Sequence, residues 1–165
     1  MKIALISVHY SPLHTSCALQ MRDMARALLS LGHEPLVIVP SKGLKNAYKI
    51  EIIDGIKVFR LKFFGATDIG YFWRGVSELL MSFTILRSIR KSGFPMKDLE
   101  GIVWYSPTIF FGPIVNLLKR KSNCPSYLIL RDIFPEWTLD LGILRKTPIY
   151  YFFKLFAKYQ YSLAN

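Results

Sequence analysis

The sequence predicts a doubly wound α/β domain with a mainly parallel β-sheet. Short apolar runs alternate along the chain with longer segments of helical periodicity. Apolar strands without a polar face are typical of a parallel sheet that helices cover on both sides. The turn Asp54-Gly55 between two strand-like runs adds a β-hairpin to this pattern, because Asp-Gly supplies the positive φ angles of a two-residue turn.

The first half of the chain is expected to form a strand, a helix, a second strand and the hairpin. The loop His9–Ser16 offers Thr15 or Ser16 as the helix N-cap, and Gly32 suits the left-handed turn that ends the helix. The expected elements are a strand over Lys2–Val8, a helix over Cys17–Leu31, a strand over Pro35–Val39, and hairpin strands over Tyr48–Ile53 and Ile56–Leu61.

The second half is expected to continue the alternation. Its elements are a helix over Tyr71–Lys91, a strand over Gly101–Tyr105, a helix over Thr108–Lys121, a strand over Ser126–Leu130, a short helix that ends near Leu141, and a last helix that Pro148 opens. This last helix is still apolar and periodic at Asn165. We therefore expect a single domain over residues 1–165 that is truncated within its last helix.

The charge balance predicts an anionic partner. The chain has 22 Lys+Arg against 11 Asp+Glu, which gives a net charge of +11. Such a surplus favours a nucleic acid, a phosphorylated lipid or an acidic bilayer surface, although it also serves to keep an apolar protein in solution. No nucleic-acid-binding motif occurs and the basic residues are scattered, so nucleic acid is not the expected partner.

The N-terminal run, the two cysteines and the lengths of the apolar stretches predict a cytoplasmic protein. Cys17 and Cys124 lie far apart without metal-ligand spacing, which is typical of buried thiols in a reducing compartment. The apolar run at the N-terminus is too short for a secretory signal. No stretch has the roughly 18 to 20 apolar residues of a spanning helix.

Three segments carry a resemblance to a known family. The first is the strand Lys2–Ser7, which leads through Tyr10-Ser11-Pro12 into a helix that ends at Gly32-His33-Glu34. The second is Asp54-Gly55-Ile56-Lys57-Val58, and the third is Arg131-Asp132-Ile133-Phe134-Pro135-Glu136. Together they resemble the N-terminal, Rossmann-like domain of retaining GT-B (family 4-like) glycosyltransferases. The third segment is similar to the bacterial O-antigen and capsule branch that includes N-acetylfucosamine transferases.

This resemblance implies an enzyme that moves a sugar from a nucleotide sugar to a lipid-linked saccharide in lipopolysaccharide or capsule polysaccharide biosynthesis. It implies a peripheral protein on the inner face of the cell membrane. No metal and no cofactor is implied, and the nucleotide sugar belongs to a C-terminal domain that the chain lacks. The 165-residue chain, as the N-terminal half of such an enzyme, is then expected to be inactive alone. The alternative is a stand-alone acceptor-binding, membrane-docking subunit without catalytic activity. The same fold class also serves nucleotide-sugar epimerases.

Loops that follow strands supply the candidate site, because ligands of doubly wound sheets sit beyond the carboxyl ends of the strands. Asp132 is the candidate catalytic residue: its carboxylate can accept a proton from an acceptor hydroxyl or orient that hydroxyl. It can equally pair with Arg131 or cap the next helix. The candidate substrate-binding residues are His9, His14, Thr15, Ser16, Arg131 and Glu136.

Each of these residues also has a structural interpretation. Thr15 and Ser16 suit helix caps, and Glu136 suits the first turn of a helix, where the helix dipole favours an acid. The loop His9–Ser16 lacks the glycine pair that the family usually has there, so close approach of its backbone to a phosphate is not predicted.

An aromatic and basic segment after Phe63 predicts contact with an anionic membrane. The residues chosen for this contact are Phe72, Trp73, Arg74 and Arg87, because aromatic rings and cations prefer the bilayer interface. The alternative is a helix that covers the sheet with its aromatic side chains in the core. The run Tyr150–Tyr161, with Lys154 and Lys158, has the same two interpretations.

Overall fold

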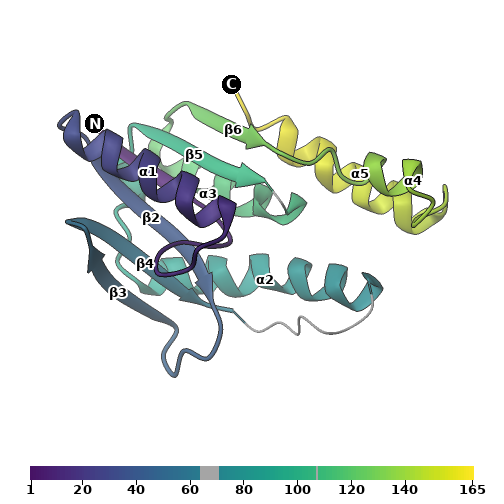
Figure 1. The fold of residues 1–165 in the computed structure, drawn as a ribbon. Coiled ribbons are helices and arrows are strands. Elements are labelled where there is room, and N and C mark those ends of the chain that lie inside the picture. Colours follow the sequence, from purple (N-terminus) through teal and green to yellow (C-terminus); the bar gives the residue numbers. More distant parts are fainter. Residues whose placement is uncertain (64–70, 107) are drawn as a thin grey trace.

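A six-stranded sheet runs through the centre of the protein (Figure 1). The computed structural model describes residues 1–63, 71–106 and 108–165, with the side chains of residues 71–79 outside that description. The strand order is β3-β4-β2-β1-β5-β6, and all neighbouring pairs are parallel except the β3–β4 hairpin. The strands are β1 (Lys2–Ile6), β2 (Glu34–Ser41), β3 (Tyr48–Ile53), β4 (Ile56–Lys62), β5 (Gly101–Ser106) and β6 (Ser126–Leu130). The predicted fold class is confirmed.

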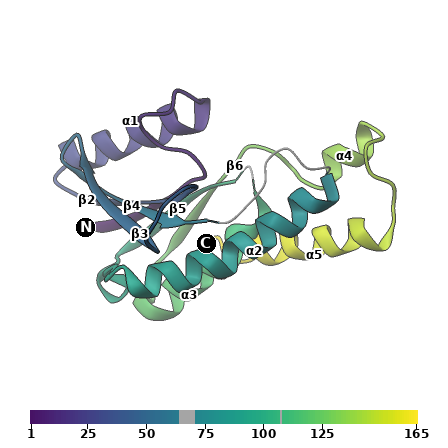
Figure 2. The ribbon, with the colours of Figure 1, turned by 90° about the horizontal axis from the view of Figure 1, so that it is seen from below.

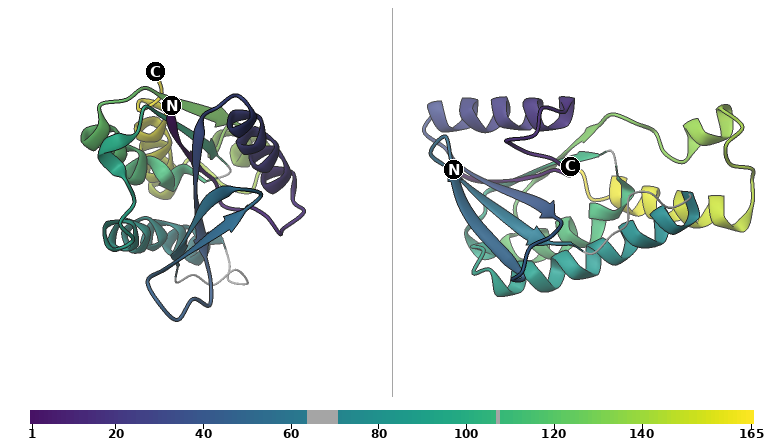
Figure 3. Two further views of the ribbon diagram at one scale, coloured as in Figure 1. Left: turned by 90° about the vertical axis from the view of Figure 1, so that its left-hand side faces the viewer. Right: turned by 60° about the horizontal axis from the view of Figure 1, so that its bottom comes forward.

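Helices cover both faces of this sheet. Helix α1 (Ser16–Ser30) lies on one face, and α2 (Tyr71–Lys91) and α3 (Gly112–Ser122) lie on the other, as the end-on view in Figure 3 shows. Helix α5 (Pro148–Tyr161) packs beside α3, and the short α4 (Glu136–Asp140) precedes it (Figure 2). Two 3₁₀ turns complete the chain, η1 (Met96–Asp98) and η2 (Ile109–Phe111).

The core has two layers because alternate strand residues point to opposite faces of the sheet. Leu5, Val37 and Val58 pack against Met21 and Ala25 of α1. On the opposite face, Ile6 and Ile38 belong to the layer that packs beneath α2 and α3. Both sides of β1 and β2 are therefore buried, which is why these strands are continuous apolar runs in the sequence.

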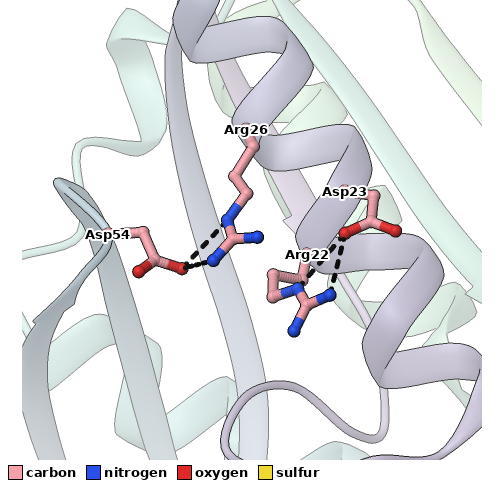
Figure 4. A network of polar contacts seen from close by, with 4 residues as sticks. All are labelled: Arg22, Asp23, Arg26 and Asp54. Carbon is pink, nitrogen blue, oxygen red and sulfur yellow. Dashed lines mark hydrogen bonds and ion pairs between the residues drawn. The ribbon is translucent and has the colours of Figure 1, made fainter.

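The hairpin turn is joined to α1 by an ion pair. Asp54 has a φ of 54° and Gly55 a φ of 78°, as the two-residue turn requires. Arg26 donates from Nε and Nη2 to Oδ2 of Asp54 at 3.1 and 2.8 Å (Figure 4). Its neighbour on the helix, Arg22, pairs with Asp23 at 3.2 Å and so points elsewhere.

Local signals place most boundaries to within two residues; β2, for example, begins at Glu34 and ends at Ser41. β1 ends at Ile6 and not at Val8. The helix expected over Thr108–Lys121 is divided into η2 and α3, because Thr108 caps η2 through its Oγ1 and Pro113 opens a new helix. α5 ends at Tyr161 and does not run on to Asn165.

The last residues of the chain lie beside the start of β6. The backbone N of Asn165 donates to the carbonyl O of Ser126, and the backbone N of Ser126 donates to Oδ1 of Asn165, both at 3.0 Å. Ser126 therefore points its N–H and C=O away from β5. Leu128 and Leu130 point theirs to the same side, where no described strand pairs with them.

Candidate functional site

The carboxyl ends of β1, β5 and β6 lie next to one another in the sheet. Adjacent strands are about 4.8 Å apart, so the loops after β1 and β6 leave the sheet at points about 10 Å apart. These loops therefore lie at one edge of the sheet, beyond the carboxyl ends of the strands, where ligands of such sheets are expected. Pro107, in the loop after β5, lies outside the described residues.

His9 and Thr15 lie together in the loop after β1. Nδ1 of His9 is 3.3 Å from Oγ1 of Thr15, and the same oxygen accepts a hydrogen bond from the backbone N of Ala18 at 3.3 Å. Thr15 is thus the N-cap of α1, which confirms the structural interpretation for this residue. His9 is exposed, and its imidazole contacts the capping residue through Nδ1.

His14 and Ser16 are exposed side chains in the same loop. Neither has a side-chain hydrogen bond or ion pair with another described residue, so both can be reached by a ligand. Ser16 is the first residue of α1 and not its cap.

The β1 loop is fixed by Arg60 of β4, which lies two strands away from β1 in the sheet. Nη2 of Arg60 donates to the carbonyl O of Ser11 at 2.5 Å, and Nε donates to Glu51. Hydrogen bonds from Lys49 and then from Arg60 hold the pKa of Glu51 below its usual value. Sequence reasoning missed Arg60; a cation among the apolar residues of β4 was the available signal.

Asp132 is exposed in the loop after β6, together with Arg131. Its carboxylate makes no hydrogen bond or ion pair with any described residue. The residue at the N-cap of α4 is Pro135, without a side-chain cap. The two structural roles considered for Asp132, a pair with Arg131 and a helix cap, are therefore not seen in the described part of the chain.

Glu136 forms an ion pair with α5, and the ring of Phe134 packs on the same helix. Glu136 lies in the first turn of α4, and its Oε1 is 3.5 Å from Nζ of Lys154. The ring of Phe134 packs against Phe153, with centroids 5.3 Å apart. Trp137 stays 39% exposed beside them.

Gln160 of α5 holds the loop after β5, and sequence reasoning missed it. This fully buried side chain accepts from the backbone N of Phe111 at 3.1 Å through Oε1. Its Nε2 donates to Oγ of Ser106 at 3.2 Å and to the carbonyl O of Thr108 at 3.1 Å. A single side-chain amide thus joins the last helix to the loop after β5, at the edge of the sheet that carries the candidate site. The available signal was a glutamine in the apolar stripe of this helix.

The residues chosen for membrane contact are only partly described. The side chains of Phe72, Trp73 and Arg74 lie outside the described residues. Arg87 is exposed on the second half of α2. This half buries Met81, Ile85 and Ile89, so here the helix covers the sheet. No helix in the described part of the chain is long and apolar enough to cross a bilayer.

The described residues contain no group of three or more His, Cys, Asp or Glu side chains that could hold a metal ion. Both cysteines are free and buried, as predicted, and burial raises the pKa of the Cys17 thiol. The site chemistry available at this edge therefore consists of carboxylate, imidazole, hydroxyl and guanidinium groups.

No protein-family model and no curated protein matches the sequence. Among solved structures, the fold is similar to the catalytic domain of starch synthase IV from Arabidopsis thaliana bound to ADP and acarbose, a GT-B glycosyltransferase. The TM-score is 0.54 at 15% sequence identity. The match covers 76% of this chain and 33% of that chain, so the chain spans about a third of the protein it matches. The likeness supports the Rossmann-like GT-B domain fold.

Proposed function

We propose that this chain is the acceptor-side, N-terminal half of a retaining glycosyltransferase. The whole enzyme moves a sugar from a nucleotide sugar to a lipid-linked saccharide in the synthesis of bacterial O-antigen or capsule. The observation that carries the proposal is the exposed carboxylate of Asp132, which has no partner among the described residues and lies at the carboxyl end of β6 in a fold similar to a GT-B domain.

The acceptor occupies the edge formed by the loops after β1 and β6. Asp132 orients the acceptor hydroxyl or takes its proton as the oxygen attacks the anomeric carbon and the bond to the nucleotide diphosphate breaks. Arg131 and His9 bind acceptor hydroxyls or phosphate oxygens, since a guanidinium and an imidazole both donate to such groups. The exposed side chains of His14 and Ser16 donate to acceptor oxygens from the same loop, and Glu136 borders the acceptor beside them.

The nucleotide sugar binds to a second domain that faces this edge, so the 165-residue chain alone binds acceptor and transfers nothing. The net charge of +11 favours an acceptor that carries phosphate groups. The loop His9–Ser16 has no glycine, so its side chains and not its backbone make the polar contacts with the acceptor.

The substitution Asp132→Asn tests this proposal in the protein joined to its donor domain. We expect kcat to fall at least tenfold with an unchanged unfolding midpoint, because the amide cannot take a proton. Asp140→Asn is the matched control: this exposed aspartate ends α4 and lies outside the proposed site. Unchanged turnover in Asp132→Asn would rule out a chemical role for the carboxylate.

A binding measurement separates the acceptor role from the chemistry. A soluble short-chain prenyl diphosphate saccharide, added to the isotope-labelled 165-residue chain, should shift the amide resonances of the loops His9–Ser16 and Arg131–Pro135. A nucleotide sugar should leave them in place. Shifts caused by the nucleotide sugar alone would place the donor on this half and overturn the assignment.

A further inference from the structure

Helix α5 has two apolar faces, of which one is buried. Its buried stripe consists of Tyr150, Phe153, Ala157 and Gln160. Phe153 and Ala157 pack on Ile109 and Phe110 of the loop after β5. This contact holds the helix firmly against the domain.

The opposite face of α5 is apolar and exposed. Tyr151, Phe152 and Leu155 expose 57%, 43% and 66% of their surface. These residues lie within one helical turn of each other and form a continuous apolar stripe. Seven of the 14 residues of α5 are aromatic, more than a helix needs for its buried side alone.

The segment that carries this stripe has charges of one sign only, and the acid beside it is Glu136 of α4, which pairs with Lys154 at 3.5 Å. Residues 141–165 contain Arg145, Lys146, Lys154 and Lys158, and no Asp or Glu. All four are exposed. Lys154 and Lys158 are one turn apart and follow the same flank of the stripe. The pKa of Lys154 is raised, first by Tyr150 and then by Glu136, so its ammonium stays protonated.

The stripe lies at the end of the protein that carries the candidate site. Helix α4 and the first turns of α5 extend past the carboxyl ends of β5 and β6 (Figures 1 and 2). The N-terminal part of α5 therefore lies at the same end of the sheet as the loop after β6.

We propose that the outer face of α5, formed by Tyr151, Phe152 and Leu155 and flanked by Lys154 and Lys158, docks on an anionic lipid bilayer. The helix lies in the plane of the interface, with its rings at headgroup depth and its cations against lipid phosphates. The proposal deepens the proposed function, because a lipid-linked acceptor is reached only by an enzyme at the membrane. The docking itself needs no catalysis and can be measured without it.

The charge pattern favours a bilayer over a second copy of this chain. A two-fold dimer through the same face would place the lysines of both copies at one interface, where like charges repel. The stripe is also convex and belongs to a single helix, and a convex row of rings and lysines fits a lipid surface.

Vesicle flotation of the 165-residue chain tests the proposal. The chain should float with phosphatidylcholine vesicles that contain about 30% phosphatidylglycerol and should remain below vesicles of phosphatidylcholine alone. Lys154→Gln with Lys158→Gln should lower the partition coefficient about 25-fold, or about fivefold for each cation. Leu155→Gln should lower it at least tenfold.

Two matched controls locate the effect on α5. Arg90→Gln with Lys91→Gln makes the same change of charge at the exposed end of α2, and Ile52→Gln makes the same polar change on a residue that is 72% exposed on β3. Both should float like the wild type. All the substituted residues are exposed, so equal circular dichroism spectra and unfolding midpoints are expected.

Three results would overturn the proposal. The first is no flotation with anionic vesicles. The second is flotation that the α5 variants leave unchanged. The third is a dimer in light scattering that Leu155→Gln abolishes, which would assign the stripe to a second copy. Flotation combined with normal turnover of the Asp132→Asn enzyme would instead retain the docking surface and reject the proposed chemistry.

Discussion

The amide of Gln160 is expected to contribute a large share of the stability of the domain. In Gln160→Leu the backbone N–H of Phe111 loses its partner inside the core, which costs about 1 to 3 kcal/mol. The lost bonds from Nε2 to Ser106 and Thr108 add about 1 kcal/mol each, and the apolar leucine recovers part of this loss. The unfolding free energy should therefore fall by about 2 to 4 kcal/mol.

Urea unfolding and thermal melting of the 165-residue chain measure this loss. For a domain of this size, about 2 to 4 °C of Tm is lost per kcal/mol, so Tm should drop by about 4 to 16 °C. Gln20→Leu is the matched control, because Gln20 lies partly exposed on α1 and makes no hydrogen bond with a described residue. Its stability should stay within about 0.5 kcal/mol of the wild type. A change equally small in Gln160→Leu would refute the reasoning.

The variant Gln160→Glu distinguishes hydrogen bonding from shape. The glutamate keeps an acceptor for Phe111 but places its second oxygen against the carbonyl O of Thr108. Burial and this repulsion favour the protonated form and raise the pKa of the carboxyl in the folded state. Stability should then fall as the pH rises above about 4.3, where the unfolded chain ionises first. A stability that is level between acid and neutral pH would contradict this account.

Three further outcomes are expected. Gly112→Ala places a Cβ 2.9 Å from the ring of Tyr159, so it should destabilise the chain by about 1 to 3 kcal/mol in urea unfolding, despite the better helix propensity of alanine. Burial raises the pKa of Tyr10 to about 12, so the wild type should lose stability as the pH rises from about 10 to 12, and Tyr10→Phe should remove this loss. Arg26→Ala removes an exposed ion pair and should lower the unfolding free energy by at most about 1 kcal/mol. Asp54→Ala should lower it more, because alanine is strained at the positive φ of Asp54, and equal losses in the two variants would contradict this.

Elements with strong local signals could be predicted from the sequence to within a residue or two. The hairpin needed only Asp54-Gly55, and the boundaries of α2 and β6 agree with their apolar patterns. The division at Gly112 could not be predicted from periodicity. The division depends on the cap that the side chain of Thr108 provides for η2. It also depends on the close packing of Gly112 against Tyr159, a contact between residues far apart in the sequence.

The candidate site, too, could be predicted only in part. The rule that ligands sit beyond the carboxyl ends of the strands was enough to select the loops of His9 and Asp132. The supports of these loops were not predictable. Arg60 reaches Ser11 across 49 positions and Gln160 reaches Phe111 across a similar separation, and only the folded chain brings these atoms together.

Beyond Ser126, the outer edge of β6 pairs with no described strand, which has a consequence for handling the 165-residue chain. The opposite edge strand, β3, carries Lys49 and Glu51, whereas β6 has no charged residue and leaves Tyr127 63% exposed. Charges on an edge strand deter pairing with other chains, and an uncharged edge with free N–H and C=O groups is a template for intermolecular sheets. Conditions or substitutions that loosen the domain are therefore expected to cause aggregation through β6, and a lysine at the position of Tyr127 is the change that guards against it.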